Sequence, residues 1–223
     1  MSSGSAVVTS LTRQVAPERA FWKLILALER ATSFLMLVLL FPVLALVAAT
    51  ISMLSRQSPL VAHLRVGQFG TPLWTLKFRT MWQRQAAAPA GGRLIEYIAD
   101  ESGIGHKGPG DPRVTSDFAR FCRRYSIDEL PQLVNVVRGE MSLVGPRPLT
   151  EGELKEHYEF DAAGVLLVKP GITGLWQVSG RSRLTYEQRR EMDLLLVRNL
   201  SLRFYLVILL RTIAVVANGK DGW

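Results

Sequence analysis

Two adjacent carboxylates, Asp128 and Glu129, lie in an arginine-rich part of the sequence. Six arginines and no lysine occur between Asp111 and Pro148, namely Arg113, Arg120, Arg123, Arg124, Arg138 and Arg147. Arginine presents several N–H donors in a rigid plane and holds phosphate oxygens in a fixed geometry, whereas a diffuse electrostatic tail is more often rich in lysine. This combination indicates chemistry on a phosphate group.

The apolar residues after this pair have helical spacing: Leu130, Leu133, Val134 and Val137. They predict a helix over residues 129–138 that ends at Gly139. Because proline is tolerated only in the first turn, Pro131 makes Asp128 the expected N-cap. At that position the helix dipole and the free N–H groups would keep Asp128 ionised and could receive phosphate oxygens. An Asp–Glu pair at a helix start is most often only a cap, but the surrounding arginines favour a functional role.

Arg147 lies between Pro146 and Pro148, and this stiff backbone would aim its guanidinium at a low cost in entropy. The glycine-rich segment 169–182 carries Trp176 and is expected to be a loop. This loop is either a simple turn or one wall of the site.

Two strands are expected over residues 61–66 and 73–81, around a turn at residues 67–72. Apolar and polar residues alternate on the second strand, so Lys77 and Arg79 share one face. Two cations on one face could clamp an anion. A solvated strand face is the more common explanation of this pattern.

A short helix is expected over residues 117–125, capped by Ser116 or Asp117. Its apolar face would consist of Phe118, Phe121, Cys122 and Tyr125. The position of Cys122 on this face favours a core residue over a nucleophile.

Composition excludes several classes of site. The 223 residues contain one cysteine and three scattered histidines, which rules out a disulfide framework, a cysteine-rich zinc module and a histidine-rich metal cage. Residues 84–110 are expected to form loops with a short helix near residues 93–98, and their glycines match no Walker or dinucleotide motif. The net charge of +8 and a pI of about 10.1 indicate anionic partners: nucleic acid, a membrane surface or phosphorylated small molecules.

Residues 31–55 carry no charge and are longer than the roughly 20 residues needed to cross the hydrocarbon core of a bilayer. This run favours membrane insertion over a secretory signal or a soluble core helix. Pro42 lies near its middle, and basic residues flank both ends. The positive-inside rule therefore favours a re-entrant helix that breaks at Pro42 and returns to the same face. A kinked spanning helix is the alternative.

Amphipathic stretches are expected at both ends of the chain. Residues 18–30 are expected to be an interfacial lead-in to the membrane segment. In residues 193–218, Arg198, Arg203 and Arg211 interrupt the apolar pattern, which suits a helix in the headgroup plane. A core-packed helix with exposed arginines is the alternative.

Four motifs occur in order: KFRTM (Lys77–Met81), DPRVT (Asp111–Thr115), DELPQLVNVVRGEMSLVGPRP (Asp128–Pro148) and PGITGLWQVSGRS (Pro170–Ser182). Together they resemble the bacterial sugar transferases, also called monotopic phosphoglycosyl transferases. The resemblance covers about residues 24–216. The residue before the helix break is Phe41, where the family often has serine.

The resemblance implies a mainly α fold with a small β-hairpin (α+β) in two parts. Residues 1–56 would form the interfacial and re-entrant membrane helix. Residues 57–223 would form a compact cytosolic catalytic domain that ends in an interfacial helix. The family lies at the cytoplasmic face of the bacterial inner membrane.

The implied enzyme is a polyprenyl-phosphate phosphoglycosyl transferase. It would move a sugar 1-phosphate from a UDP-sugar to undecaprenyl phosphate, releasing UMP, as the first membrane step of surface glycan biosynthesis. Membrane lipids are expected partners and nucleic acid is not. A homodimer, the identity of the sugar and the glycan pathway are left open.

The resemblance also implies residue roles. Asp128 would attack the β-phosphorus and form an aspartyl phosphosugar, and the lipid phosphate would then attack that intermediate in a ping-pong mechanism. Mg²⁺ would be ligated by Asp128 with Glu129 nearby. The expected phosphate-binding residues are Arg147, Arg123, Arg113, Lys77 and Arg79, with Pro146 and Pro148 beside Arg147.

Two alternatives are kept. One is another membrane-bound phosphotransferase, which would release CMP or inorganic phosphate instead of UMP. The other is a non-enzymatic basic protein that binds membrane surfaces or nucleic acid, which would leave the acidic pair among the arginines unexplained.

Overall fold

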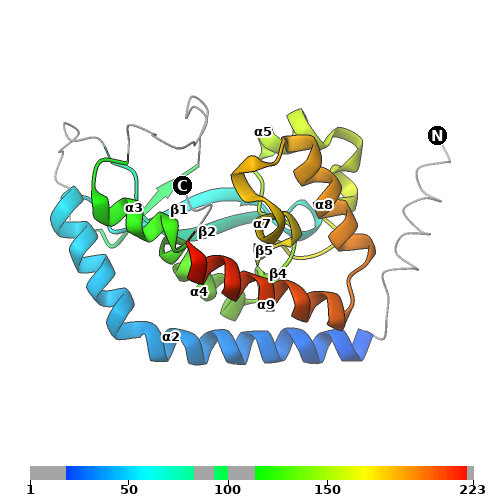
Figure 1. The fold of residues 1–223 in the computed structure, drawn as a ribbon, viewed down its shortest axis with the longest axis horizontal. Coiled ribbons are helices and arrows are strands. Elements are labelled where there is room, and N and C mark those ends of the chain that lie inside the picture. Colours follow the sequence, from blue (N-terminus) through cyan, green and yellow to red (C-terminus); the bar gives the residue numbers. More distant parts are fainter. Residues whose placement is uncertain (1–18, 83–92, 100–113, 220–223) are drawn as a thin grey trace.

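A computed structural model describes residues 19–82, 93–99 and 114–219 (Figure 1). Helices form most of this part of the chain, around one three-stranded and one two-stranded sheet. This agrees with the expected α+β class. Arg113 lies outside the described residues.

The apolar run lies within one long helix, α2 (Arg19–Ser55). Figure 1 shows that α2 is bent: its first part follows the lower edge of the molecule and its last part rises toward the first strand. Pro42 is the one proline in α2. It has no N–H to donate to the preceding turn and its ring crowds that turn, which gives a physical cause for the bend. Pro42 therefore bends the helix without ending it.

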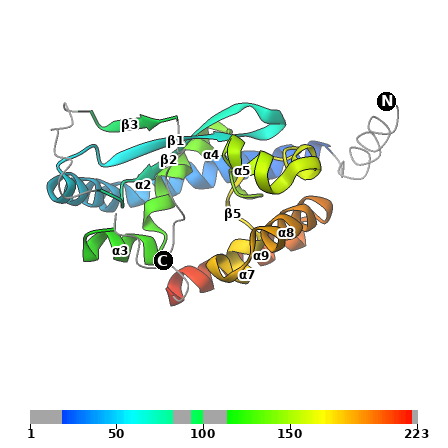
Figure 2. The ribbon, with the colours of Figure 1, turned by 90° about the horizontal axis from the view of Figure 1, so that it is seen from above.

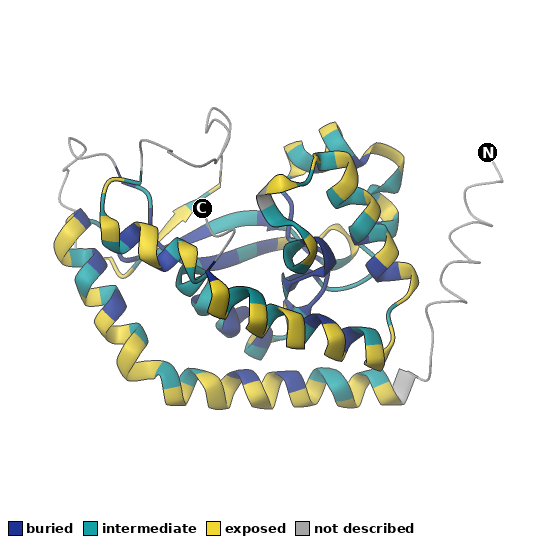
Figure 3. Cartoon of the chain, in the orientation of Figure 1, coloured by how far each residue is buried: buried dark blue, intermediate teal, exposed yellow. Residues whose placement is uncertain are grey.

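The surface of α2 is mostly exposed. It is the one helix in the described residues that is long and apolar enough to cross a membrane, and only 11% of its most apolar stretch is buried. Over residues 34–46 no side chain is buried, and Figure 3 shows this part of the helix mainly as exposed. The core helix of a soluble protein would bury much more of its surface. The exposure of α2 supports a membrane environment for it.

The predicted hairpin is confirmed. Strand β1 (Leu60–Val66) pairs antiparallel with β2 (Pro72–Phe78), and a 3₁₀ turn, η1 (Gln68–Gly70), connects them. A third strand, β3 (Ile95–Ile98), pairs parallel with β1. The helix expected near residues 93–98 was therefore wrong, because Ile-Glu-Tyr-Ile suits a strand and the edge of β1 was free to pair with it.

Helix α3 (Asp117–Arg124) begins as predicted, with the Ser116 side chain accepting a hydrogen bond from the amide of Ala119. Ala119 and Cys122 are buried against the last part of α2. Phe121 is half exposed and packs against Tyr125, so the expected apolar face is only partly buried.

The helix predicted over residues 129–138 consists of two parts. A 3₁₀ helix, η2 (Ile127–Gln132), precedes α4 (Leu133–Arg138). Gly139 ends α4 in the left-handed region at φ 76°, as predicted. Asp128 was expected to be the N-cap, and this was wrong: the cap position is Ser126, and Asp128 lies inside η2.

The remainder of the chain packs around a short parallel pair, β4 (Ser142–Val144) and β5 (Gly171–Thr173). The elements between these strands are α5 (Glu151–Glu153), the π-helix η3 (Leu154–Tyr158), η4 (Glu159–Asp161) and α6 (Ala162–Val165). After β5 come α7 (Leu175–Ser179), η5 (Arg181–Arg183), α8 (Tyr186–Arg198) and α9 (Leu202–Asn218). The segment expected to be a loop around Trp176 is therefore largely β5 and α7.

Viewed from above, the sheet of β1, β2 and β3 and the helices α7, α8 and α9 lie on opposite sides of the molecule (Figure 2). One apolar cluster joins the last part of α2 to β2 and α3. Another joins α7, α8 and α9 to β4. Helix α9 buries Tyr205 and Ile208 but leaves Leu202, Leu206, Leu210 and Ile213 exposed, so one face packs on the core and the other remains apolar at the surface.

Candidate active site

The acidic pair lies on η2, which starts from an unusual backbone position. Ser126 has a φ of 53°, in the left-handed region, and Pro131 lies in the second half of the short helix. Both carboxylates are partly exposed, since neither Asp128 nor Glu129 falls in the buried class. The 3₁₀ geometry therefore holds the pair at the surface, close to the basic residues of β2 and of the segment after β4.

Glu129 is neutralised by cations. Its Oε1 atom lies 2.6 Å from Nζ of Lys77 and 3.6 Å from Nη1 of Arg147. Burial would raise the pKa of Glu129, but Lys77, Arg147 and Arg181 outweigh it and hold this pKa at about 2. Glu129 therefore stays ionised, and it links Lys77 and Arg147, which are far apart in the sequence.

Asp128 has a different environment. Its carboxylate makes no hydrogen bond or ion pair with any described side chain, although the charges of Lys77 and Arg123 act on it. Burial and the negative charge of Glu129 raise the pKa of Asp128 to about 6. The helix start was expected to keep Asp128 ionised, whereas a pKa of about 6 leaves part of this carboxyl group protonated below neutral pH. Asp128 is the carboxylate of the pair that is available for chemistry.

Arg147 is positioned by closely packed backbone. The Gly145 amide donates to the Thr173 carbonyl at 2.9 Å and the Gly171 amide donates to the Pro146 carbonyl at 2.8 Å. A Cβ on Gly145 would lie 2.4 Å from a backbone oxygen, so only glycine allows this approach. Pro146 and Pro148 are buried on either side of Arg147.

The Arg147 guanidinium lies 5.7 Å from the ring centre of Trp176. Trp176 is buried and carries Arg189 at 4.9 Å as well. Cation–π contacts of this kind hold a guanidinium in place without neutralising it. This geometry favours the interpretation that the Trp176 segment is one wall of the site over the interpretation that it is a simple turn.

The other predicted phosphate-binding residues divide into two groups. Arg123 lies near the pair, with its Nη1 3.4 Å from the hydroxyl of Thr80, and its charge lowers the pKa of Asp128. Arg79 is held elsewhere, by the carboxylate of Glu96 and the carbonyl of Ser58. Lys77 and Arg79 therefore do not form a clamp together.

A small polar cavity of about 10 Å³ adjoins Glu129, Lys77 and Arg147. Its lining also includes the polar residues Arg65, Gln132 and Gln177, which the sequence did not single out for this role. Arg65 could have been found from the sequence, because it is a charged residue inside a mostly apolar strand. No sequence pattern pointed to the two glutamines.

Asp193 is a further residue that the sequence did not reveal. It is fully buried on α8, and its Oδ2 atom accepts a hydrogen bond from the Tyr158 hydroxyl at 2.8 Å. Burial raises the pKa of Asp193 to about 7, against the opposing effects of Tyr158, Arg147 and Trp176. Asp193 is therefore a buried acidic group next to Arg147 and Trp176.

Cys122 is buried, and burial together with the charge of Asp128 raises the pKa of its thiol to about 11. A protonated, buried thiol is a poor nucleophile. The prediction that Cys122 is a core residue is confirmed.

The acidic pair is also the candidate site for Mg²⁺. No group of three or more histidine, cysteine or acidic side chains that could hold a metal occurs among the described residues. Mg²⁺ commonly binds through one or two carboxylates together with the phosphates of a substrate. The available carboxylate of Asp128 fits such a site, whereas the Glu129 oxygen is already engaged by Lys77.

The model of the family described as bacterial sugar transferase matches residues 20–219. The UDP-galactose-lipid carrier transferase of Erwinia amylovora is 44% identical over 193 residues, covering 82% of this chain and 38% of the relative. The exopolysaccharide production protein ExoY of Rhizobium meliloti is 41% identical over 188 residues, covering 84% and 82%. The undecaprenyl-phosphate galactose phosphotransferase of Salmonella typhimurium is 42% identical over 166 residues, covering 72% and 33%. The chain thus spans about a third of the length of the Erwinia and Salmonella relatives, and most of the length of ExoY.

Proposed function

Because the chain belongs to the bacterial sugar transferase family, we propose that it transfers a sugar 1-phosphate from a UDP-sugar to undecaprenyl phosphate and releases UMP. The names of the relatives support both substrates, since one contains UDP-galactose and another undecaprenyl phosphate. The enzyme class is that of a phosphoglycosyl transferase. The reaction would be the first membrane step in making a surface glycan, and ExoY supports exopolysaccharide as one such product.

One observation carries the mechanism: the two adjacent carboxylates differ in their partners. Glu129 is neutralised by Lys77 and Arg147, whereas Asp128 has no ion-pair partner among the described side chains. An ionised carboxylate that is not engaged in a direct ion pair, next to several cations, suits attack on an electrophilic phosphorus. We therefore assign Asp128 as the nucleophile.

In the first step, a carboxylate oxygen of Asp128 forms a bond to the β-phosphorus of the UDP-sugar. The bond from that phosphorus to the bridging oxygen breaks, and UMP leaves with the electron pair. Lys77, Arg123 and Arg147 lie where they can stabilise the charge on the phosphate oxygens. The product is an aspartyl phosphosugar.

In the second step, an oxygen of undecaprenyl phosphate attacks the same phosphorus and the carboxylate of Asp128 leaves. This regenerates the enzyme and gives a lipid diphosphate sugar. Neither step needs a general base, because both attacking oxygens are already anionic. Glu129 holds Lys77 and Arg147 in place through both steps.

Mg²⁺, when bound, would neutralise pyrophosphate charge and make the phosphorus more electrophilic. Asp128 would supply a ligand oxygen and Glu129 would lie nearby. The remaining ligands would be substrate phosphates and water.

We further propose that α2 is re-entrant and seats the site at headgroup depth on the cytoplasmic face of the inner membrane. The bend in α2, its exposed apolar residues and the exposed stripe on α9 support this arrangement. The lipid acceptor carries its phosphate at the same depth. This location would let a long apolar substrate reach Asp128 without leaving the bilayer.

The direct test is UMP release from a panel of UDP-sugars, measured with and without undecaprenyl phosphate and Mg²⁺. We expect lipid-dependent turnover with at least one sugar, and none from Asp128→Asn. Asp117→Asn is a suitable control, because Asp117 is exposed on α3 and Arg120 is its one ion-pair partner among the described residues. Release of CMP or inorganic phosphate, or full turnover by Asp128→Asn, would contradict the proposal.

A further inference from the structure

Glu29 is the one acidic residue of α2, and it lies buried in the first part of that helix. It is only 5% exposed. Its Oε1 atom accepts hydrogen bonds from the Ser142 hydroxyl at 2.6 Å, from the Leu143 amide at 3.2 Å and from the Tyr205 hydroxyl. These donors come from β4 and α9, more than a hundred residues away in the sequence. One carboxylate therefore joins α2 to two other elements.

The next residue makes a second long-range contact. Nε of Arg30 donates to the carbonyl of Val137 at 2.9 Å, in the last turn of α4. A guanidinium at the C-terminal end of a helix satisfies a carbonyl that has no partner within the helix. Two consecutive residues of α2 thus hold β4 and α4.

These two elements lead to opposite halves of the candidate site. β4 runs directly into the glycine and proline residues that position Arg147. α4 continues η2, which carries Asp128 and Glu129. Glu29 and Arg30, which are neighbours on α2, therefore contact the two elements that lead to the two halves of the candidate site.

General packing does not explain these contacts. Burying a carboxylate is costly, and an apolar side chain of similar size would often stabilise a fold as well or better. Directional hydrogen bonds instead fix how far a helix is rotated and shifted along its axis. This matters on α2, because no side chain over residues 34–46 is buried and Leu44 alone among them packs against a described core cluster, so packing fixes that position only weakly.

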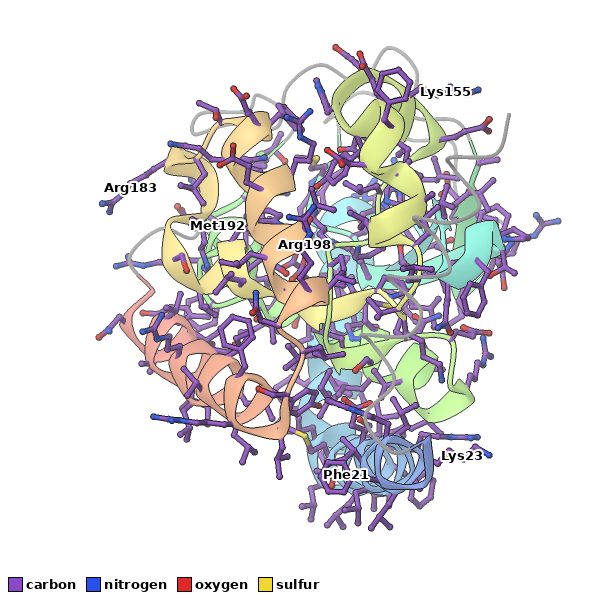
Figure 4. All side chains as sticks on the ribbon, turned by 90° about the vertical axis from the view of Figure 1, so that its right-hand side faces the viewer. Phe21, Lys23, Lys155, Arg183, Met192 and Arg198 are labelled. Atoms are coloured by element: carbon purple, nitrogen blue, oxygen red, sulfur yellow. The ribbon has the colours of Figure 1, made fainter. Side chains whose placement is uncertain are left out.

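We propose that Glu29 and Arg30 form a clamp through which the membrane-seated helix α2 sets the separation between Asp128 and Arg147. They are positioning residues, since they act through β4 and α4 and touch no reacting atom. The role in catalysis rests on the proposed function, whereas the mechanical coupling of α2 to the Arg147 segment does not. Figure 4 looks toward one end of α2 and shows Phe21 and Lys23 there, at the opposite end of the molecule from Lys155.

The test uses the full chain in lipid nanodiscs and three changes to the clamp. Glu29→Leu removes the acceptor, Tyr205→Phe removes one donor with little risk to folding, and Glu29→Gln keeps an amide oxygen that can accept the same bonds. Ser33→Ala is the matched control. Ser33 is buried one turn further along α2, and its hydroxyl has no hydrogen-bond partner in the described part of the chain.

Two readouts are compared. Hydrogen–deuterium exchange reports on residues 142–149 without any reaction, and steady-state kinetics separate kcat from KM for the UDP-sugar. We expect Glu29→Leu to exchange faster over residues 142–149 and to lose roughly tenfold or more in kcat with KM nearly unchanged, because small misplacements of charge-stabilising groups act on the transition state. Tyr205→Phe should show a smaller change of the same kind, and Glu29→Gln and Ser33→Ala should resemble the wild type.

Unchanged exchange over residues 142–149 in Glu29→Leu and Tyr205→Phe would overturn the clamp. So would equal losses in Ser33→Ala, or a kcat per folded molecule that stays at the wild-type value. An absence of UMP release by the wild type is a different result. It would overturn the proposed function, while the exchange data would still decide whether α2 holds the Arg147 segment.

Discussion

Asp128 and Glu129 are adjacent in sequence but differ in charge state and in partners. Glu129 is ionised at all ordinary pH values because Lys77 and Arg147 surround it. Asp128 titrates near pH 6 because it is partly desolvated beside that fixed negative charge. The pair is therefore asymmetric: one carboxylate organises cations and the other is available to react. This asymmetry could not be read from the sequence, since it depends on which distant cation reaches which carboxylate.

At the residue scale, we predict that Arg147→Ala lowers kcat/KM by roughly 10²–10³, the loss typical of one preorganised charge-stabilising group. Arg147→Lys should recover little of this, because a point charge does not reproduce the planar guanidinium that lies against Trp176. Steady-state UMP release measures both variants. A fully active lysine variant would show that Arg147 supplies only general positive charge.

The acidic pair also predicts a pH dependence. If Asp128 is the nucleophile, it must be ionised to attack, so kcat/KM should fall as the pH drops through about 6. In Glu129→Gln a negative neighbour is lost and Lys77 and Arg147 are released, and both changes favour the ionised form of Asp128. The acid limb of the pH profile should therefore move to lower pH, even though the rate itself falls. An acid limb that stays in place would assign it to a group other than Asp128.

At the element scale, a single buried amide joins the sheet to the helix of the site. Asn135 on α4 is fully buried, accepts a hydrogen bond from the Leu76 amide at 3.1 Å and donates to the Trp74 carbonyl at 2.8 Å. These are backbone groups of β2 on the edge that no strand among the described residues pairs with. The same contact places Lys77, the next residue on β2, beside η2.

We predict that Asn135→Ala lowers the free energy of unfolding by about 2–3 kcal/mol, because it leaves two buried backbone groups without partners. Denaturant titration in detergent micelles, followed by tryptophan fluorescence, measures this. Asn199→Ala serves as a control, since Asn199 is exposed at the end of α8 and its side chain bonds, within the described part of the chain, only to the Leu195 carbonyl of that helix. Equal small effects of the two changes would mean that Asn135 does not hold the edge of β2.

The elements that the sequence predicted well are those with a local signal. The hairpin followed from alternation, α3 from its cap at Ser116, and the end of α4 from Gly139. The elements that differed depend on long-range contacts. β3 is a strand because β1 offers an edge, and Asp128 lies inside a 3₁₀ helix because the chain turns at Ser126 in the left-handed region.

The same distinction applies to the site. Asp128, Glu129, Lys77, Arg123 and Arg147 were found from residue type, spacing and resemblance, and the fold brings them together. Arg79 has the same local pattern as Lys77 but is held by Glu96 on a strand that was not expected. Arg65 and Asp193 were missed because burial, which sets their importance, is a property of the tertiary structure.

At the scale of the whole molecule, the exposed apolar residues of α2 and α9 predict how the enzyme sits in a membrane. If α2 is re-entrant, cysteines placed at Ser5 and at the exposed Lys155 should both be protected from an impermeant maleimide in intact spheroplasts and labelled after lysis. The native Cys122 will not interfere, because it is buried with a raised thiol pKa. Opposite labelling of the two positions would establish a spanning helix instead.

The central claim is that Asp128 carries the sugar phosphate covalently, and intact-protein mass spectrometry tests it most directly. Enzyme incubated with UDP-sugar and Mg²⁺, without lipid acceptor, should release up to one equivalent of UMP and gain the mass of a sugar phosphate on the peptide that contains Asp128. Asp128→Asn should give neither signal, and adding undecaprenyl phosphate should remove the adduct. If UMP appears only when the lipid is present and no adduct forms, transfer is direct, and Asp128 is not the nucleophile.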